Sequence, residues 1–335
     1  MQTFRARVGL TAGWLAALLA ATAAAHAQAP ALLVLEKGAR SLAIVDPVRL
    51  EVLARADAGE DPHEVVAAAD GRLAYITNYG AFSTPGHTLS VVDLVARKAL
   101  PPVDLGALRA PHGLELAGGR VYFTAEGSKL IGRYDPSARH VDWVLGIGQD
   151  RTHMLVVSRD EQRIFTADVN AGTVTLLERA RQGDVSGWTA THVPVGRGPE
   201  GFDVSPDGRE LWAANSGDGT VAIVDLATKQ VVQTVPVDTK RSNRLKFTPD
   251  GKRVLVSDLG SGDLVVLDAA SRRVVKRLGL GHGAAGILVC GDGSRAFVAV
   301  SSDDNVAVVD LTTLTVTGRI ATGKGPDGLA WASGR

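Results

Sequence analysis

The chain repeats one short pattern along most of its length. An apolar run ends on an acidic residue at seven places: Asp46, Asp93, Asp135, Glu178, Asp225, Asp268 and Asp310. The gaps between these acids are 47, 42, 43, 47, 43 and 42 residues. Repetition at such a spacing is typical of a propeller or a solenoid, in which one supersecondary unit is used many times. The repeat therefore constrains the fold more than any other feature of the sequence.

The local pattern inside each repeat favours the propeller. Each unit holds four short runs rich in Val, Ile, Leu and Thr, which have the length of β-strands. Turn sequences such as Pro206-Asp207-Gly208 and Pro249-Asp250-Gly251 separate these runs. Four antiparallel strands form one blade, and blades arranged in a ring bury both of their faces. We therefore predict an all-β, seven-bladed β-propeller with four antiparallel strands in each blade.

The N-terminus has the pattern of a secretory signal peptide. Arg5 and Arg7 precede an Ala- and Leu-rich apolar run over 8–25, and Ala25-His26-Ala27 supplies small residues for cleavage. The run is rich in alanine and ends at a cleavage pattern, which favours a signal peptide over a membrane anchor. We therefore predict a signal peptide over 1–27 and one propeller domain over 28–335. The expected location is periplasmic or secreted, with no transmembrane anchor after cleavage.

The two ends of the domain together predict how the ring closes. The segments 32–35, 42–45 and 51–55 are interpreted as the second, third and fourth strands of a blade. The segment 328–332 is interpreted as a lone first strand. The C-terminal strand is therefore predicted to pair with the N-terminal blade, which would remove an open sheet edge.

Charge and cysteine content exclude several classes of function. Without Arg5 and Arg7 the chain has 36 − 2 = 34 basic residues against 36 acidic ones, and it has no long basic run. Binding driven by phosphate charge needs a basic surface, so we expect no nucleic-acid partner. The single cysteine, Cys290, lies in an apolar run and is interpreted as a core residue. It cannot form an intramolecular disulfide, and no Cys-x-x-Cys-His motif for covalent haem is present.

The repeat resembles the YVTN repeat of bacterial propellers. The resemblance rests on Tyr75-Ile76-Thr77-Asn78 followed by Leu89-Ser90-Val91-Val92-Asp93. A looser copy of the first motif is Leu211-Trp212-Ala213-Ala214-Asn215. The resemblance extends over the whole of 28–335 and implies a YncE-like seven-bladed propeller within the lactonase-like superfamily. That superfamily includes lactonases, ligand-binding proteins and surface proteins, so the fold alone does not specify an activity.

Strand direction predicts which end of the propeller carries function. In a four-stranded antiparallel blade, the loop that enters the first strand and the loop that leaves the second lie at the same end. At this end the entry loops predict a ring of channel-facing residues, one from each blade: His63, His112, His153, Glu200, Asn243, Ala285 and Asp327. The exit loops add Tyr79 and Glu126. We call this end the mouth of the propeller.

This ring suggests a binding site for a small polar or anionic molecule. The predicted ligand-binding residues are His63, Glu64, Tyr79, His112, Glu126, Asn243 and Asp327. Neutral imidazoles with a carboxylate also ligate divalent transition metals, so His63, His112, His153 and Glu200 are a candidate metal site. Without a metal, a histidine beside a glutamate can exchange protons near neutral pH. No cofactor other than such a divalent ion is expected.

The lactonase branch of the superfamily implies catalytic roles for three residues. That branch places a histidine, a glutamate and an arginine at the starts of innermost strands in neighbouring blades. The segment around His153 resembles the histidine-bearing entry, Glu200 follows in the next blade, and Arg241 or Arg244 in the one after. The resemblance thus implies His153, Glu200 and Arg244 as catalytic residues of a lactonase-like hydrolase.

Two other functions remain open at this point. The near-neutral charge and regular repeat also fit a non-catalytic periplasmic binding or envelope protein with a protein partner. The histidines also fit a metal- or redox-associated envelope protein. A monomer is expected in each case.

Overall fold

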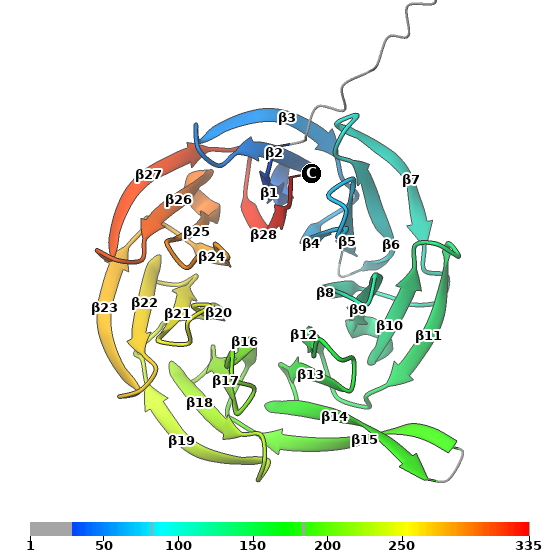
Figure 1. Cartoon of the computed structure of the whole chain (residues 1–335), viewed down its shortest axis with the longest axis vertical. Coiled ribbons are helices and arrows are strands. Elements are labelled where there is room, and N and C mark those ends of the chain that lie inside the picture. The colour runs from blue at the N-terminus through cyan, green and yellow to red at the C-terminus, as the bar shows by residue number, and fades with distance from the viewer. Residues whose placement is uncertain (1–28, 82, 183–184, 335) are drawn as a thin grey trace, which may run out of the picture.

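The computed structural model describes residues 29–81, 83–182 and 185–334, and the predicted signal peptide over 1–27 lies outside them. Seven four-stranded antiparallel sheets stand in a ring around a central channel (Figure 1). The predicted all-β, seven-bladed architecture is confirmed. Within the described residues the helices are three short 3-10 turns, and no helix is long and apolar enough to cross a membrane.

The blades are numbered from the N-terminus, each from its innermost to its outermost strand. Blades 1 to 4 consist of β28 (Pro326–Ala332), β1 (Ala31–Glu36), β2 (Ser41–Asp46) and β3 (Glu51–Asp57); β4 (Pro62–Ala67), β5 (Leu73–Ala81), β6 (Thr84–Asp93) and β7 (Lys98–Asp104); β8 (Pro111–Ala117), β9 (Arg120–Ala125), β10 (Leu130–Asp135) and β11 (His140–Gly146); and β12 (Thr152–Val157), β13 (Arg163–Asp168), β14 (Thr173–Gln182) and β15 (Val185–Pro194). Blades 5 to 7 consist of β16 (Pro199–Val204), β17 (Glu210–Asn215), β18 (Thr220–Asp225) and β19 (Gln230–Pro236); β20 (Ser242–Phe247), β21 (Arg253–Asp258), β22 (Asp263–Asp268) and β23 (Arg273–Gly279); and β24 (Ala284–Val289), β25 (Arg295–Val300), β26 (Asn305–Asp310) and β27 (Thr315–Ala321). The 3-10 turns are η1 (Lys37–Ala39), η2 (Glu126–Ser128) and η3 (Ser301–Asp303).

The ring closes through blade 1, as the two chain ends predict. β28 pairs antiparallel with β1, with Leu32 opposite Trp331 and Ala31 opposite Ala332. In Figure 1 the C-terminal strand lies beside the N-terminal one inside the same blade. This pairing gives the innermost edge of β1 a hydrogen-bonding partner and ties the two ends of the domain together.

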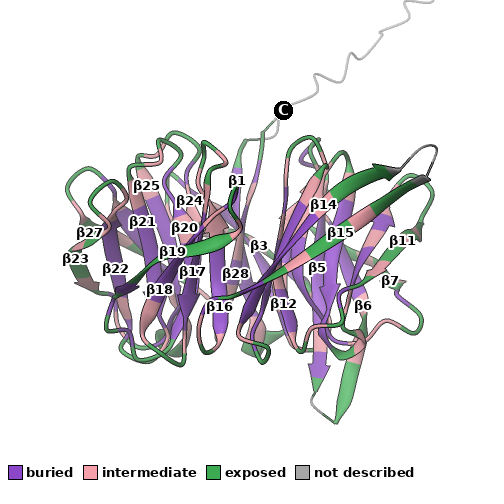
Figure 2. Ribbon diagram, turned by 90° about the horizontal axis from the view of Figure 1, so that it is seen from below, coloured by how far each residue is buried: buried purple, intermediate pink, exposed green. Residues whose placement is uncertain are grey.

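Burial follows position within the blade. The second strand of blade 7, β25, is buried at five successive positions because both faces of the blade pack against neighbours. The outermost strand β11 alternates between exposed and half-buried residues, because its outer face meets water. Figure 2 shows this gradient, with buried strands inside and exposed segments at the rim. Cys290 is buried within the apolar core, and burial raises the pKa of its thiol.

The repeated acids end the third strands by a common mechanism. Asp46 accepts hydrogen bonds from the backbone N–H groups of Val48 and Arg49, which turns the chain toward the fourth strand. Asp93, Asp135, Asp225 and Asp310 each accept from the same two backbone positions, and Asp268 accepts from the backbone N–H and the hydroxyl of Ser271. Glu178 is different, since its carboxylate pairs with Lys229 and β14 continues past it to Gln182.

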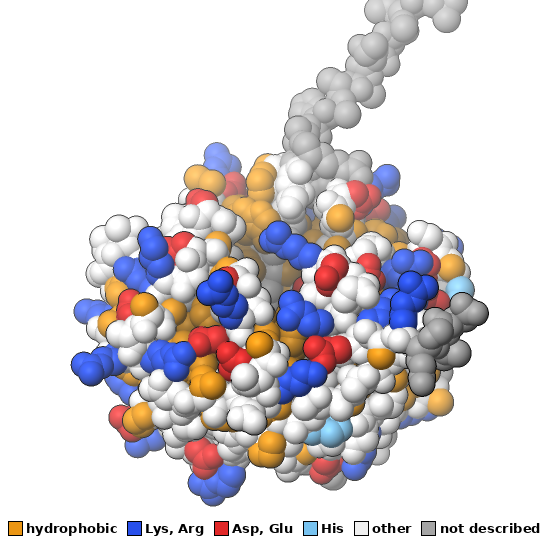
Figure 3. Space-filling view, turned by 60° about the horizontal axis from the view of Figure 1, so that its bottom comes forward, with side chains coloured by type: hydrophobic (Ala, Val, Ile, Leu, Met, Phe, Trp, Pro, Cys, Tyr) orange, Lys and Arg blue, Asp and Glu red, His pale blue; other side chains and the backbone are white. Residues whose placement is uncertain are grey.

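Two hairpins extend beyond the regular blades, one from each end of the propeller (Figure 2). The β14–β15 hairpin projects from the end that also carries the C-terminus, and the β5–β6 hairpin projects from the opposite end. In the β5–β6 hairpin, β5 continues to Ala81 and β6 starts at Thr84. Positive and negative side chains are intermixed on the face seen in Figure 3.

Candidate functional site

A cavity of about 750 Å³ occupies the mouth of the propeller. One residue from each blade lines it, at the start of the innermost strand: His63, His112, His153, Glu200, Asn243, Ala285 and Asp327. The structure therefore places all seven channel-facing positions of the predicted ring around one space. Lys37, Asp61, Arg151, Arg241 and Arg244 complete its charged lining.

Contacts between neighbouring blades fix the histidines. The Thr77 hydroxyl donates to the carbonyl of His112 at 2.7 Å, and the Thr124 hydroxyl donates to the carbonyl of His153 at 2.7 Å. Gly113 permits the second approach, because a Cβ there would lie 2.6 Å from the His153 carbonyl oxygen. Both backbones are thus held by the preceding blade, which limits how far the imidazoles can move.

Three of the entry loops hold a side-chain-bearing residue in a left-handed conformation. Asp61, Ala110 and Arg151, each just before an innermost strand, have φ values of 50°, 52° and 58°. The equivalent position is glycine in three other blades, at Gly198, Gly283 and Gly325. A non-glycine residue in this region costs about 1 to 2 kcal/mol. In blades 2 and 4 the residues that adopt this conformation are Asp61 and Arg151, and both line the cavity.

The three histidines form a row of contacting, mutually tilted rings, called the stack below, with angles of 55° and 36° between successive ring planes. The ring centroids of His63 and His112 are 4.4 Å apart, and those of His112 and His153 are 3.8 Å apart. Burial, followed by the neighbouring positive charges, holds the pKa of His112 well below its ordinary value. Its imidazole is therefore neutral at physiological pH.

Both ring nitrogens of His63 are already engaged. Its Nδ1 donates to the backbone carbonyl of Asp61 at 2.9 Å, and its Nε2 accepts from the Lys37 ammonium at 2.7 Å. Burial and the Lys37 charge lower the pKa of His63 to about 4. His63 therefore supports the stack and the lysine, and it has no free lone pair for a further ligand.

Glu126 orients His153 from the neighbouring blade. The Oε1 atom of Glu126 accepts a hydrogen bond from Nδ1 of His153. Its Oε2 atom accepts from the Tyr79 hydroxyl at 2.7 Å and lies 3.5 Å from Nε of Arg151. Burial raises the pKa of the Glu126 carboxyl, but the hydrogen bonds and charge of its partners outweigh burial and leave the pKa below its ordinary value. An ionised Glu126 therefore keeps the proton of His153 on Nδ1 and leaves Nε2 as the free acceptor.

The free nitrogen of His153 faces Glu200. The Nε2 atom of His153 is buried without a hydrogen-bond partner among the described residues, and it lies 3.9 Å from Oε1 of Glu200. No hydrogen bond to the Glu200 carboxylate forms within the described part of the chain, and the side chain lines the cavity. A separation of this size is too long for a direct hydrogen bond and suits a bridging water molecule.

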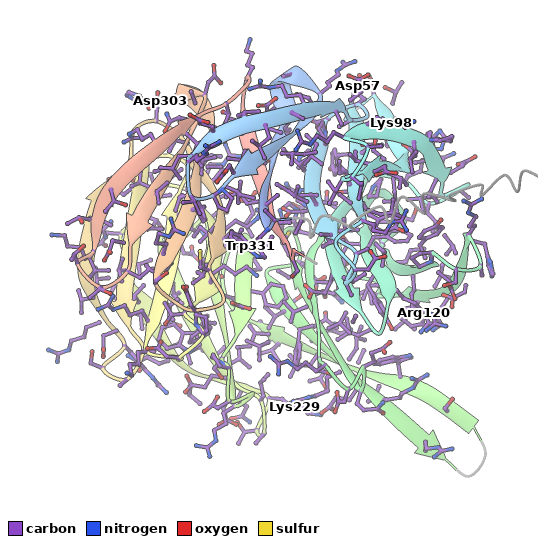
Figure 4. The ribbon with its side chains drawn as sticks, turned by 45° about the horizontal axis from the view of Figure 1, so that its top comes forward. Asp57, Lys98, Arg120, Lys229, Asp303 and Trp331 are labelled. Atoms are coloured by element: carbon purple, nitrogen blue, oxygen red, sulfur yellow. The ribbon has the colours of Figure 1, made fainter. Side chains whose placement is uncertain are left out.

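Arg244 and Glu64 close the channel beneath the cavity. The guanidinium of Arg244, from blade 6, donates to Glu64 of blade 2, and both side chains are largely buried. Arg244 lines both the mouth cavity and a narrower cavity of about 280 Å³ deeper in the channel. Trp331, seen near the centre of the ring in Figure 4, lines this deeper cavity. The Arg244–Glu64 pair therefore forms the floor of the mouth.

The structure separates the predicted site residues into three groups. His63, His112, His153, Glu200, Asn243, Arg244 and Asp327 line the mouth cavity. Tyr79 and Glu126 bond to each other, and Glu126 bonds to His153. Glu64 lies on the far side of Arg244, where it lines the deeper cavity. His87, which is outside these three groups, pairs with Asp104 at the exposed rim.

Sequence reasoning missed Lys37 and Asp61. Lys37 lies 3.3 Å from Asp61 and 3.9 Å from Asp327, at the centre of the charged lining. It follows the second strand of blade 1 in the position that Tyr79 and Glu126 hold in blades 2 and 3. Aligning the split blade with the others would have found it.

The side chains that lie close enough together to hold a metal ion differ from the set expected from sequence. Among the described residues, one candidate ligand atom from each of His112, Glu126 and His153 lies within 4.8 Å of the others. His63 and Glu200, which were predicted as ligands, are not in this cluster. The reason is geometric for both. Both nitrogens of His63 are bonded, to Lys37 and to Asp61. Glu200 lies on the far side of His153 from Glu126.

We expect His63 to make the protein less stable in acid. Below pH 6.5 the unfolded chain protonates this histidine, whereas the folded protein keeps it neutral to about pH 4. The stability linked to His63 is therefore complete above pH 6.5 and decreases as the pH falls through that window, by on the order of 2 kcal/mol at pH 4.5. Urea unfolding of wild type and His63→Gln at pH 7 and 4.5, with EDTA present, measures the difference. As a control, His140→Gln replaces an exposed histidine and should keep the wild-type pH dependence of the free energy of unfolding. If His63→Gln kept that same pH dependence, the expectation would be wrong.

Comparison with known proteins agrees with this fold. A family model described as Lactonase, 7-bladed beta-propeller matches residues 146–278, which contain His153, Glu200 and Arg244. The chain is similar to the lactonase-like propellers. The match covers fewer than half of the residues, and the narrower YVTN and YncE-like resemblance stays a prediction. No curated protein matches the sequence at a significant level.

Solved structures share the architecture at low identity. A candidate 6-phosphogluconolactonase from Bacteroides fragilis superposes with a TM-score of 0.74 and 17% identity, covering 90% of this chain and 97% of that one. A protein of unknown function from Desulfotomaculum acetoxidans superposes with a TM-score of 0.74 and 16% identity, covering 90% of this chain and 99% of that one. Hydrazine synthase from Kuenenia stuttgartiensis superposes with a TM-score of 0.65 and 18% identity, covering 80% of this chain and 89% of that one. At these identities the likeness shows the fold alone.

Proposed function

We propose that the chain is a lactonase-like hydrolase that opens a cyclic ester bearing a negative charge in the mouth cavity. The observation that supports this most is the gap of 3.9 Å between Nε2 of His153 and Oε1 of Glu200. Both groups lack a hydrogen-bond partner among the described residues, and both face the same cavity. A water molecule placed between them would be held by His153 and would have a carboxylate beside it to accept its proton.

The proposed reaction needs only groups that line the cavity. Glu200 accepts a proton as the water oxygen attacks the ester carbonyl, and His153 holds the water in place. The ring C–O bond then breaks, and the proton passes from Glu200 to the departing alkoxide. The product is the open-chain hydroxy acid. Arg244, whose side chain is fixed by Glu64, supplies positive charge for the oxyanion that forms during attack.

The cations of the wall favour an anionic substrate. Lys37 is paired with Asp61, and Arg151 lies beside Glu126, so their charges are partly neutralised. Arg241 also lines the cavity, and it forms no ion pair within the described residues. Its guanidinium is therefore free to pair with a carboxylate or phosphate on the substrate.

A panel of neutral, carboxylated and phosphorylated lactones tests the proposal. We expect hydrolysis of the anionic members, and we expect Arg241→Gln to raise their KM about tenfold, as loss of one partly solvated charge-assisted hydrogen bond should. Lys240→Gln removes the neighbouring charge outside the cavity lining and should leave KM unchanged. Failure to hydrolyse any lactone above the buffer rate would count against the proposal. An equal effect of Arg241→Gln on neutral and anionic lactones would count against the anionic substrate.

The place of action is also a proposal. The N-terminal pattern over 1–27 supports export, so we propose that the hydrolase acts outside the cytoplasm. Cell fractionation of the full-length chain, followed by N-terminal sequencing of the mature protein, would test both the location and cleavage after Ala27.

A further inference from the structure

The innermost part of the mouth holds a compact group of metal-ligating side chains. His112 and His153 start the innermost strands of blades 3 and 4, and Glu126 begins the turn η2 that follows β9. One candidate ligand atom from each lies within 4.8 Å of the others. Their exposed fractions are 3%, 2% and 7%, so solvent cannot satisfy them as it would at the surface.

Two of the four ring nitrogens in this group are buried without a partner. They are Nδ1 of His112 and Nε2 of His153. A buried polar atom left without a hydrogen bond costs about 1 to 3 kcal/mol, so native proteins rarely keep two of them side by side. The third histidine of the stack provides the contrast, because Asp61 and Lys37 satisfy both nitrogens of His63. Among the three histidines, the unsatisfied nitrogens thus belong to the two that cluster with Glu126, and Oδ1 of Asn243 at the mouth is also buried without a partner.

The surroundings hold these side chains in place as an outer shell holds metal ligands. Tyr79 and Arg151 bind Oε2 of Glu126, which leaves Oε1 directed at His153. Thr77 and Thr124 fix the backbones of His112 and His153. Hydrogen bonds of this kind orient metal ligands and raise affinity in known metal sites.

We propose that His112, His153 and Glu126 bind one divalent transition-metal ion of the zinc class, which would replace the proton between Nδ1 of His153 and Oε1 of Glu126. Two imidazole nitrogens and one carboxylate oxygen form a ligand set that zinc prefers, and ligand atoms about 2 Å from a common ion lie within reach of one another after small side-chain movements. Three protein ligands leave a further coordination position for water, as in catalytic sites. His112 and His153 line the mouth cavity, so that position can open toward a substrate.

The metal site goes beyond the proposed hydrolysis and does not depend on it. If hydrolysis also occurs, a bound ion would supply a water of lowered pKa next to the cavity, and Glu200 would remain the nearby proton acceptor. The two ideas therefore use the same geometry but fail separately. Metal binding can be measured without any substrate.

Titration of untagged, EDTA-treated protein tests the site. We expect one equivalent of Zn²⁺ per chain by calorimetry, with a Kd at or below about 1 µM, and a visible absorption band when Co²⁺ is used in its place. His112→Asn and Glu126→Gln should each weaken Zn²⁺ binding at least tenfold, since each removes one ligand. His282→Asn is the matched control, because His282 forms an exposed pair with Asp303 that could bind metal weakly at the surface. It should leave the stoichiometric site unchanged.

Two results would overturn the metal site. The first is binding of well below one equivalent of Zn²⁺ per chain. The second is a Zn²⁺ affinity that is unchanged in both His112→Asn and Glu126→Gln. If a variant fails to fold, the wild-type protein still gives an answer, because a ligand at 100 times its Kd stabilises the folded state by about 2.7 kcal/mol and raises Tm. No rise in Tm with saturating Zn²⁺ would also reject the site. Stoichiometric metal in a protein that opens no lactone would reject the proposed hydrolysis alone.

Discussion

Glu200→Gln should lower kcat for lactone hydrolysis by about 10² to 10⁴-fold while leaving substrate binding nearly unchanged. The amide keeps the shape and burial of the side chain but cannot accept the proton of the attacking water. His153 would still hold that water, since its link to Glu126 does not involve Glu200. Steady-state kinetics and calorimetric titration with a hydrolysis-resistant substrate analogue together separate the loss of turnover from any loss of binding.

Glu210→Gln provides the control in the same blade. Glu210 begins β17 at the end opposite the mouth, where it bonds to Trp212 and Arg272. It shares residue type and blade with Glu200, so its replacement reports general effects on the fold. Full activity in Glu200→Gln, or an equal loss in both variants, would show that Glu200 does not act as the base.

Glu64→Gln should reduce the free energy of unfolding by about 3 to 5 kcal/mol, the usual cost of leaving one member of a buried ion pair alone. Arg244 has 7% and Glu64 has 12% of its side chain exposed, so little water would reach the unpaired guanidinium. The pair also joins blades 6 and 2 across the channel, so its loss removes a contact between distant parts of the chain. Urea unfolding of wild type, Glu64→Leu, Arg244→Met and the variant that carries both substitutions completes a double-mutant cycle.

The double variant should recover most of the stability that either single variant loses, because it removes both charges together. An exposed pair gives the comparison: Arg40 and Glu60 have 62% and 53% of their side chains exposed. Glu60→Gln should change the free energy of unfolding by less than about 1 kcal/mol. Additive losses at Glu64 and Arg244 would mean that the two charges do not stabilise each other.

The number of blades and the closure of the ring could be predicted because they depend on local patterns. Each aspartate of the repeat ends a strand by bonding to the turn that follows it, as Asp46 does with Val48 and Arg49, so the signal and the structure lie within a few residues. Strand parity then fixes which end each loop occupies, without any knowledge of packing. This is why seven channel-facing positions could be chosen from sequence and why all seven line the same cavity.

Partners across the ring could not be predicted in the same way. The sequence suggested His63 as a ligand, but only the packed structure shows that Lys37 and Asp61 occupy both of its nitrogens. The pairing of Arg244 with Glu64 joins residues 180 positions apart in sequence. Such contacts depend on the tilt of each blade and on side-chain rotamers, which local periodicity does not encode.

By itself, the sequence determined the blades, the order in which they close and the ring of residues at the mouth, because strand length, turn chemistry and alternation are local properties of the chain. Only the tertiary structure decided which of those residues are free. It left Nε2 of His153 and Nδ1 of His112 without partners, placed Glu126 behind His153, and set Arg244 against Glu64. These distinctions arise where seven separate strands meet around one channel, so they depend on distances between blades.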